Sequence, residues 1–332
     1  MSIDVDVADE SEWNDIVERL GGATPFHRYG ALAVTADHSG RELVPYVGYK
    51  GQEPVGLFPL FEGSRGPVRT VFSPPPELEV NYLGPVANDA HGAKQRKAER
   101  RHRRFVEAVM ETVGENGDPD YTHVRTGVDY PDPRPFIWNG FDATPRFTYV
   151  VDVGRDTDDL FMSFSSDVRS NVRRAREDLQ FDIEEGDAGD AERIIRHVRE
   201  RHDEQDVPYN VPPAYAGDLH RRLPDGTVRP YTLTSGGEFV GGLLTLEDDE
   251  TLYTWQRVAD LDSDIPASDL LDWEAIRQAA DRGLDRVDLV GANNPRLCGY
   301  KAKFNPEVRT HYSLERSSRM ADVLKWLYLR FR

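Results

Sequence analysis

The chain is poor in cysteine and in long apolar runs. Its single cysteine, Cys298, excludes a disulfide within the chain and is typical of a reducing compartment. No apolar run approaches the ~20 residues that a membrane-spanning helix needs. The opening segment, SIDVDVADESEW, also lacks the apolar core of a signal peptide. We therefore expect a cytoplasmic protein without a membrane-spanning segment.

Several catalytic motifs are absent as well. The nine histidines form no HExxH pattern and there is no C-x-x-C pair, so we expect no metal site. The chain also lacks a G-x-S-x-G elbow, a GxxxxGK[ST] loop and a GxGxxG turn after a strand. Hydrolase, P-loop NTPase and dinucleotide oxidoreductase activities are thus unsupported, and we expect no tightly bound cofactor.

Lysine is scarce, because only six of the 41 basic residues are lysines, while 59 acidic residues give a net charge of −18. A dispersed acidic surface with little lysine is typical of an intracellular protein of a salt-loving microbe, where salt screens self-repulsion. An ordinary acidic protein is the alternative. The length of 332 residues, with 38% hydrophobic residues, favours two packed domains.

An internal match sets the expected architecture. Residues 45–56, PYVGYKGQEPVG, and residues 230–241, PYTLTSGGEFVG, agree at six of twelve positions without a gap. Each segment has the pattern of a β-hairpin, and each is followed by a strand, a helix and an extended segment in the same order. A recurring order of this kind predicts a duplicated α+β unit. The later elements are expected at 68–74 and 251–258 for the strands, 103–115 and 269–283 for the helices, and 121–128 and 286–292 for the extended segments.

Further helices are predicted at 10–20, 158–178 and 191–205 from their apolar periodicity. The seam between the two halves is expected near PRFTYVVDV, after the proline-rich YPDPRPF. The predicted fold class is α/β (α+β), with two tandem domains that each hold a mixed β-sheet flanked by helices. We assign an N-terminal domain to 1–145, a C-terminal domain to 146–313 and an amphipathic C-terminal helix to 314–332.

The element order resembles a known family. Hairpin, strand, helix and strand form the core of the GNAT acyltransferase fold, and two such domains in tandem resemble the Fem-type aminoacyltransferases. FTYVVDV before RSNVRRARE is similar to that family's strand and R-x-x-I-R-K-A helix, and GYKAKF to its aromatic-Lys-x-x-Phe motif. PASDLLDWEAIRQAADRGLDRVDLVGA is similar to its helix that leads into a "G…fDlgG" strand. The first half resembles the family by architecture only, and it has no counterpart of GYKAKF. The matching positions are Arg169, Val172, Arg173, Arg174, Ala175, Tyr300, Lys301 and Phe304.

The resemblance implies an N-acyltransferase that is active through the C-terminal domain, with a non-catalytic N-terminal domain. Acyl transfer to an amine creates an oxyanion, which a positive charge or oriented donors must stabilise. The compact ammonium of lysine suits a single oxygen. By resemblance, Lys301 has this role and Tyr300 packs beside it. Lys303 shares the face of Lys301 if the segment is extended, and it binds a phosphate or nothing. The alternative is that both lysines cap an exposed strand.

A strand at 251–258 places Tyr253, Trp255 and Arg257 on one face. In the GNAT fold this strand borders the substrate groove, so these side chains are candidate substrate contacts. Aromatic residues on a strand also occur in the core, which is the alternative.

Other polar residues are candidates of the same kind. Asp288 is a candidate general base if burial raises its pKa, or else a polar residue at the edge of a central strand. Asn293 and Asn294 follow a strand end and either contact substrate or form a turn. Arg169 and Arg173 are spaced i, i+4 on one helical face, and they bind phosphate or form surface ion pairs.

The donor and acceptor are only partly constrained. Simple acetyl-CoA enzymes of this fold have a glycine-rich loop before the main helix that holds pyrophosphate. The corresponding RVADLDSDIPASDLL has no glycine. Its absence favours the Fem-type enzymes, which use aminoacyl-tRNA, but it leaves the donor open between acyl-CoA and aminoacyl-tRNA. The expected acceptor is a small-molecule, lipid-linked or sugar-linked amine.

Two segments bear on partners. The basic run at 94–105, KQRKAERRHRRF, is either a tRNA-binding surface or a solvated helix face, and we expect no DNA partner. The tail at 320–332 either touches a membrane surface or docks on its own domain. Two other functions stay open, namely an acetyl-CoA-dependent N-acetyltransferase and a non-catalytic duplicated binding module.

Overall fold

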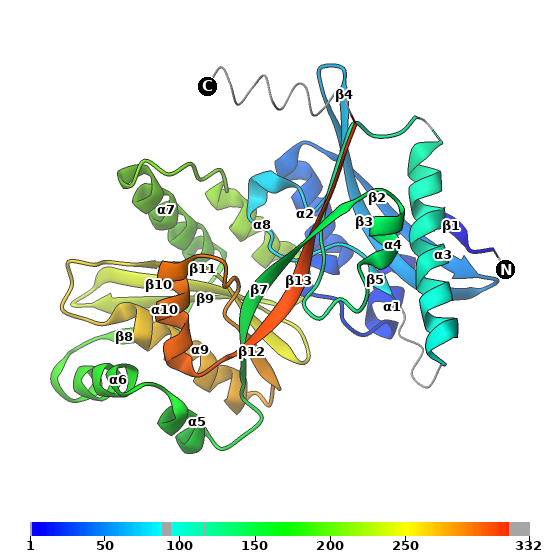
Figure 1. Cartoon of the computed structure of the whole chain (residues 1–332). Helices are drawn as coiled ribbons and strands as arrows, with labels where there is room; N and C mark the ends of the chain where they lie inside the picture. The colour runs from blue at the N-terminus through cyan, green and yellow to red at the C-terminus, as the bar shows by residue number, and fades with distance from the viewer. Residues whose placement is uncertain (1, 88–93, 116, 319–332) are drawn as a thin grey trace. The chain divides into compact units, whose positions relative to one another are not determined.

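The computed structural model describes residues 2–87, 94–115 and 117–318. The chain forms two units (Figure 1). The first unit contains the residues up to Arg146 and those from Thr310 onward, and the second contains Phe147–Arg309. Each unit holds a mixed sheet flanked by helices, which confirms the predicted fold class.

The first sheet has the strand order β1-β2-β3-β4-β6-β13. Its neighbours are antiparallel except for the parallel pair of β4 and β6. Its elements are β1 (Asp4–Val7), α1 (Glu10–Arg19), η1 (Pro25–His27), α2 (Tyr29–Ser39), β2 (Glu42–Lys50), β3 (Glu53–Arg65), β4 (Val68–Ser73), η2 (Pro76–Leu78), β5 (Val86–Ala87), α3 (Gln95–Gly114), β6 (Tyr121–Arg125), α4 (Arg134–Trp138) and β13 (Glu307–Ser317).

The second sheet has the order β7-β12-β11-β10-β9-β8, and here the parallel pair is β11 and β12. Its elements are β7 (Asp142–Asp152), α5 (Thr157–Ser163), α6 (Ser166–Asp178), β8 (Asp182–Glu185), α7 (Ala188–Glu204), α8 (Pro213–Arg222), β9 (Val228–Ser235), β10 (Glu238–Glu247), β11 (Thr251–Ala259), α9 (Ala267–Asp281), β12 (Arg286–Asp288), α10 (Pro295–Lys301) and η3 (Ala302–Phe304).

The two halves of the chain run through the same order of elements, from β1 to β7 and from β8 to β13. The two matching segments are hairpins, β2–β3 and β9–β10, as predicted. The last strands, however, are exchanged. β7 pairs with β12, with Val151 opposite Val287, and β13 pairs with β6, with Leu314 opposite Val124. Each sheet therefore takes its last strand from the other half of the chain.

This exchange corrects the expected boundary at residue 313. Residues 310–317 complete the first sheet, because Leu314 is fully buried in the core of the first unit. The predicted C-terminal helix is therefore wrong at 314–317, which belong to β13, and residues 319–332 lie outside the described residues.

Another difference concerns the helix predicted at 158–178, which is divided into α5 and α6. The chain is extended at Phe164 and Ser165, with ψ angles of 162° and 153°. Phe164 is buried against Trp273 and Phe304, with ring centroids 5.6 and 5.3 Å away. The Ser165 N–H donates to the Lys303 carbonyl at 2.8 Å. Burial of one aromatic ring thus interrupts the helical pattern.

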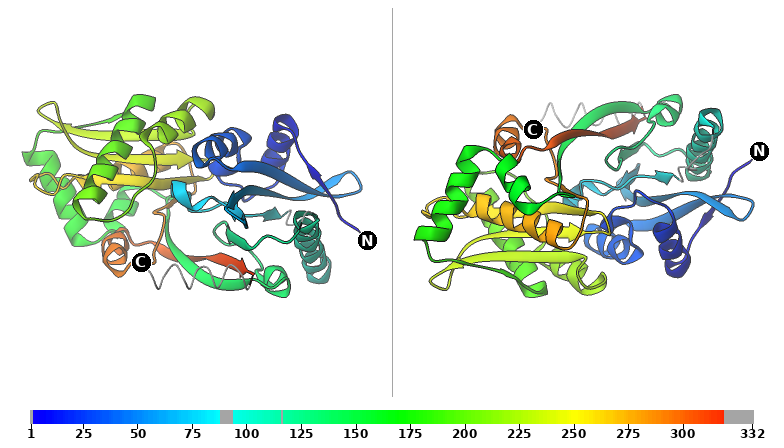
Figure 2. Two further views of the ribbon diagram at one scale, coloured as in Figure 1. Left: turned by 90° about the horizontal axis from the view of Figure 1, so that it is seen from above. Right: turned by 90° about the horizontal axis from the view of Figure 1, so that it is seen from below.

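Helices cover both faces of each sheet (Figure 1, Figure 2). In the second unit, a Cβ atom on Gly241 would meet Ala267 of α9 at 3.2 Å, while one on Gly242 would meet Ile194 of α7 at 2.5 Å. Successive residues of a strand face opposite sides, so α7 and α9 lie on opposite faces. In the first unit, α1 and α2 lie on one side of the sheet and α3 on the other.

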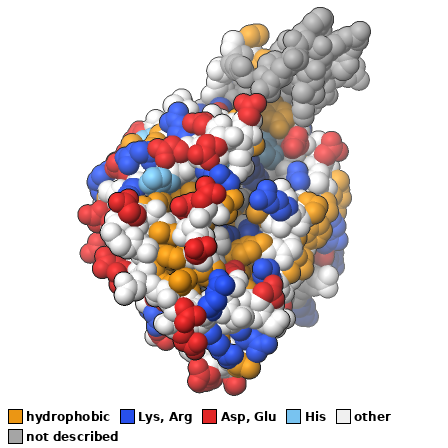
Figure 3. Space-filling model, turned by 90° about the vertical axis from the view of Figure 1, so that its left-hand side faces the viewer, with side chains coloured by type: hydrophobic (Ala, Val, Ile, Leu, Met, Phe, Trp, Pro, Cys, Tyr) orange, Lys and Arg blue, Asp and Glu red, His pale blue; other side chains and the backbone are white. Residues whose placement is uncertain are grey.

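Figure 3 shows acidic and basic side chains interspersed with apolar ones on one face of the molecule. Among the described residues, no helix is both long and apolar enough to cross a membrane. In the same part of the chain, no group of three or more histidine, cysteine or acidic residues is arranged to hold a metal ion.

Candidate active site

In the second unit, the parallel strand β12 ends before its neighbour β11 does. β11 and β12 pair only over Thr251–Tyr253 and Arg286–Asp288, whereas β11 continues to Ala259. Ligands of open α/β sheets bind outside the carboxyl ends of parallel strands, where neighbouring connections diverge. The loop after β12 leads into α10, which carries Tyr300 and Lys301. These residues are therefore placed by the end of β12.

Lys301 is buried and lies at the end of a helix, so the alternative of an exposed strand cap is wrong. Its Nζ donates to the carbonyl oxygens of Val290 at 2.6 Å and Gly291 at 3.0 Å. An ammonium group has three N–H donors, and these contacts occupy two of them. Burial and, to a smaller extent, Arg257 lower the pKa of Lys301 to about 8. Near neutral pH the group is still mainly charged.

The loop that Lys301 contacts has unusual backbone geometry. Val290 has a φ of +48°, which is strained for a β-branched residue, and Gly291 has a φ of +84°. Asp288 is buried, and its Oδ1 accepts from the Val290 N–H at 2.7 Å and from the Thr148 hydroxyl at 2.6 Å. Asp288 and Lys301 thus hold the loop from two sides. The suggested role of Asp288 as a general base stays a prediction.

A second polar group lies beside Lys301. Asp272 of α9 is 1% exposed and forms an ion pair with Arg257 of β11. The Tyr300 hydroxyl donates to Asp272 Oδ2 at 2.8 Å and accepts from Arg257 at 3.3 Å. Burial, and next the nearby Asp272, raise the pKa of Tyr300 well above its usual value, so the phenol stays protonated.

Asp272 has one atom that the described residues leave without a hydrogen bond. Its Oδ1 is buried and has no partner among them. A buried carboxylate oxygen without a donor is costly, and such atoms mark places that a ligand or an ordered water completes. Asp272 was not predicted from the sequence, although it is spaced i, i+4 and i, i+7 with the buried Ile276 and Ala279 on one helical face.

The other strand candidates face the protein interior. The Tyr253 hydroxyl donates to Asp248 at 3.0 Å, and burial with this neighbouring carboxylate raises its pKa well above the usual value. Trp255 is 6% exposed and meets Tyr215 edge to face, with ring centroids 5.7 Å apart. Of the three residues predicted on this strand, only Arg257 lies with Tyr300.

The two asparagines have structural contacts. Asn293 accepts from the Phe147 N–H at 3.0 Å and donates to the Phe147 carbonyl at 2.9 Å, which reproduces a strand pairing. Asn294 caps the N-terminus of α10, because its side chain accepts from the Arg296 N–H at 3.0 Å. Both therefore fix the segment that carries Lys301.

The remaining cations lie on α6 and η3. Arg169 and Arg173 both contact the sulfur of Met162, at 3.7 and 3.5 Å, and neither forms an ion pair among the described residues. Lys303 forms an ion pair with Asp167 at 3.2 Å and lies 5.8 Å from the Tyr300 ring centroid. The structure therefore does not bring these three into one cluster with Lys301 by any direct contact.

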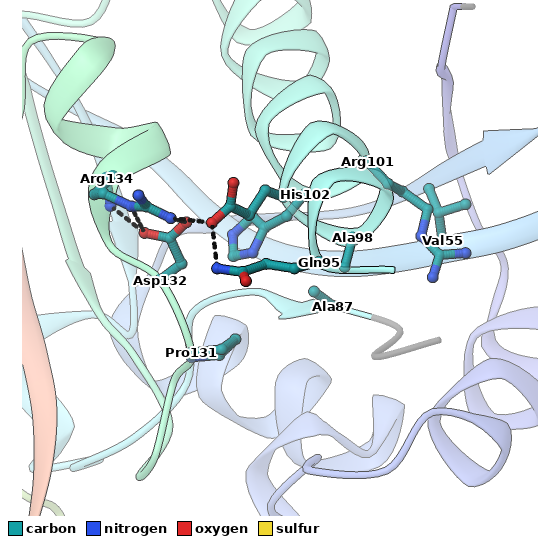
Figure 4. A pocket seen from close by; sticks show the side chains of 10 residues that line it. Val55, Ala87, Gln95, Ala98, Arg101, His102, Pro131, Asp132 and Arg134 are labelled. Atoms are coloured by element: carbon teal, nitrogen blue, oxygen red, sulfur yellow. Dashed lines mark hydrogen bonds and ion pairs between the residues drawn. The ribbon is translucent and has the colours of Figure 1, made fainter. Parts of the chain in front are cut away.

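Two cavities lie elsewhere in the described residues. One, of about 250 Å³, is in the first unit between α3 and the segment before α4 (Figure 4). Its Arg134 is already paired with Glu99 and Asp132, at 2.8 Å each. The other, of about 280 Å³, lies at the edge of the second sheet, where Arg286 pairs with Glu250. Both hold paired charges, and the chemistry at Lys301 makes the end of β12 the better candidate.

Comparison with known proteins places this geometry in a family. Residues 162–302 match the family described as acetyltransferase (GNAT) domain. Residues 162–302 of this chain are therefore similar to GNAT domains. The match contains β11, β12, Asp272 and Lys301, so the candidate site lies inside the GNAT domain. Comparison with curated protein sequences gives no match.

Solved structures with the same fold are similar over the whole chain. FemX aligns with a TM-score of 0.71 and 10% identity, covering 93% of this chain and 96% of FemX. The C-terminal domain of an Agrobacterium fabrum protein assigned as a lysylphosphatidylglycerol synthetase gives 0.59 and 11%, covering 96% and 94%. A tandem GNAT protein from the clavulanic acid biosynthesis pathway gives 0.55 and 12%, covering 95% and 98%. The GNAT fold and its tandem arrangement are thereby shown.

Proposed function

We propose that the chain is an N-acyltransferase of the Fem type, which transfers an aminoacyl group from an activated donor to an amine acceptor. The supporting observation is Lys301. It is buried against the loop after β12, keeps one N–H donor unoccupied by the described residues, and is held by the strained backbone of that loop.

Acyl transfer to an amine requires a positive group beside the carbonyl oxygen of the donor. The amine nitrogen attacks the carbonyl carbon of the donor, the carbonyl oxygen becomes an oxyanion, and collapse expels the alcohol or thiol of the donor. The third N–H of Lys301 is suited to the oxyanion, because a preorganised donor in a water-poor site stabilises developing charge strongly. Beside Lys301, Tyr300 and Arg257 are held in place by their contacts with Asp272.

An aminoacyl ester is favoured over an acyl-CoA by the loop before α9. This loop contains Asp260, Asp262 and Asp264, and Asp269 lies in the first turn of the helix. Carboxylates at a helix N-terminus repel the pyrophosphate of CoA, which other proteins bind at such ends through free N–H groups. Aminoacyl-tRNA is therefore the proposed donor, and a small-molecule, lipid-linked or sugar-linked amine is the proposed acceptor.

The test is transfer by the full chain, measured by mass spectrometry of the products. Acetyl-CoA and a mixture of aminoacyl-tRNAs are offered in separate reactions with the same panel of amines. We expect product from aminoacyl-tRNA. Product from acetyl-CoA alone would replace this donor with the alternative, an acetyl-CoA-dependent N-acetyltransferase. No product in either reaction would favour the non-catalytic binding module.

Variants then test the role of Lys301. Lys301→Met should lower kcat by about 100-fold or more, as loss of one oxyanion donor does. Lys50→Met is the control, because Lys50 ends a hairpin strand of the first unit. It should leave the rate unchanged. Circular dichroism checks that both variants are folded, and equal rates for the two variants would remove Lys301 from the mechanism.

A further inference from the structure

Three ionisable residues of the first unit, none of them predicted from the sequence, share one neighbourhood. Arg125 is the last residue of β6, Arg146 lies on β7 and His311 on β13. β6 and β13 are antiparallel, with Ser313 opposite Arg125. Alternate residues of a strand face the same side, so His311 projects from the same face of the sheet as Arg125.

Neither arginine forms an ion pair within the described residues. Arg125 donates to the Val80 carbonyl at 3.1 Å. Burial and then the repulsion of Arg146 lower the pKa of Arg125, while the Glu79 carboxylate acts in the opposite direction. The two guanidinium groups repel each other, and the carboxylate of Glu79 acts against this repulsion at Arg125.

His311 is the third member, and it is buried in an incomplete environment. The residue is 6% exposed, and its Nδ1 is buried with no hydrogen-bond partner in the described part of the chain. Its ring meets the Tyr82 ring edge to face, with centroids 4.9 Å apart. Burial, followed by Arg125 and Arg146, lowers the pKa of His311 to about 4, so the imidazole is neutral near pH 7.

The place of this group in the fold is significant. β6 is parallel to β4, just as β12 is parallel to β11 in the second unit. Arg125 ends β6, and Asp288 ends β12. The group therefore lies at the carboxyl end of the parallel pair in the first unit, which is the usual position of a ligand in such sheets.

We propose that Arg125, Arg146 and His311 bind the phosphate group of a ligand in the first unit. Guanidinium groups donate two parallel hydrogen bonds to phosphate oxygens. A nearby anion favours the protonated imidazole, so His311 gains a proton on binding and its Nδ1 becomes a donor. Two permanent positive charges and one acquired charge match a phosphate dianion better than a singly charged carboxylate. This binding does not depend on acyl transfer.

The test uses the full chain with labelled histidine side chains, followed by NMR during pH titration. Inorganic phosphate, glycerol 3-phosphate and adenosine 5′-monophosphate are the probes, and the last two separate lipid-type from nucleotide-type sources. We expect phosphate to raise the pKa of His311 by about one unit or more. The histidine signal is assigned by its loss in His311→Asn. His27 is an internal control, because both of its ring nitrogens already have hydrogen-bond partners.

A matched pair of variants separates the site from general charge effects. Arg146→Gln removes an exposed arginine that forms no ion pair with any described residue, and it should weaken phosphate binding about tenfold, or by about 1.4 kcal/mol. Arg134→Gln removes an exposed arginine of the same unit that pairs with two acids, and it should bind as the unchanged chain does. The proposal is overturned if phosphate leaves His311 unchanged, if acetate acts as strongly, or if the two variants weaken binding equally.

Discussion

At the scale of single residues, burial decides what each ionisable group does. Lys301 keeps its charge in the interior because two carbonyl groups receive its N–H bonds, and the same burial lowers its pKa. Asp272 is compensated by Arg257. His311 has no such compensation from described residues and is neutral instead. Buried Lys301 and Asp272 of the second unit thus keep their charges through their partners, whereas buried His311 of the first unit loses its charge.

The lowered pKa of Lys301 predicts two opposite effects of alkaline pH. The oxyanion role needs the charged amine, so kcat should fall as pH rises above about 8. The unfolded state holds its proton up to a pKa of 10.5, and between these values it binds more protons than the native state. The free energy of unfolding should therefore increase from pH 8 to 10.5, by up to about 3 kcal/mol.

Rate profiles and denaturant unfolding across this pH range measure the two effects. In Lys301→Met the alkaline gain in stability should disappear, because the residue no longer titrates. If kcat of the unchanged chain and of Lys301→Met depends on pH in the same way, the oxyanion role of Lys301 is wrong.

Two of the buried histidines, His27 and His311, predict a loss of stability in acid. Burial lowers the pKa of both His27 and His311 to about 4, against 6.5 in the unfolded chain. Between pH 6.5 and 4 the unfolded state binds more protons, so the free energy of unfolding should fall as pH decreases through this window. His27→Gln should reduce this pH dependence, as measured by urea unfolding at several pH values. An unchanged slope in the variant would contradict the burial of His27.

At the scale of elements, glycine sets how closely α3 approaches the first sheet. A Cβ atom on Gly56 would lie 2.6 Å from the ring of Phe105, which is fully buried in α3. Real Cβ atoms do not approach a ring so closely, so Gly56→Val must displace the helix. We expect a loss of about 1–3 kcal/mol in the free energy of unfolding.

Gly21→Ala is the control for that substitution, since nothing lies within 4 Å of a Cβ built there. Thermal and urea unfolding of the two variants give the comparison. Similar midpoints for Gly56→Val and Gly21→Ala would show that the contact between α3 and the sheet adjusts without cost.

The sequence predicted those elements whose signals are local. Alternating apolar residues and glycine turns identified both hairpins, and periodicity identified α7 and α9. The rarity of lysine and the GYKAKF motif pointed to Lys301, whose contribution to catalysis stays a prediction. Asp272 and His311 could not be predicted from the sequence, because their importance depends on partners that lie far along the chain. The exchange of β7 and β13 could not be predicted for the same reason. The apolar pattern of each strand is compatible with the edge of either sheet.

At the scale of the whole molecule, the comparisons show the GNAT fold for both units and a similarity to GNAT domains over residues 162–302. The duplication in evolution, the salt-loving source, the cytoplasmic location and the tRNA and membrane contacts stay predictions. The N-terminal unit was expected to have lost its chemistry. Its group of Arg125, Arg146 and His311 gives it a proposed binding role.

The exchanged strands predict unequal behaviour of two fragments. Residues 147–309 contain all the strand segments that pair in the second sheet. Residues 1–146 lack β13 and expose the edge of β6, where Val124 is otherwise buried. We expect fragment 147–309 to fold alone. Fragment 1–146 should aggregate, because an open sheet edge pairs with other chains.

Size-exclusion chromatography and circular dichroism of the purified fragments measure this difference. A peptide of residues 307–318, added to fragment 1–146, should reduce its aggregation by supplying β13. A monomeric, folded fragment 1–146 would show that the last strand is dispensable.

The chain leaves the ribosome from its N-terminus, yet the first unit needs residues 310–317, which are made only after the whole second unit. Residues 147–309 are translated before 310–317, so the later unit can finish folding while the earlier one still lacks its edge. During synthesis the unfinished sheet must be kept from wrong partners, and a stalled or truncated product would carry that exposed edge permanently.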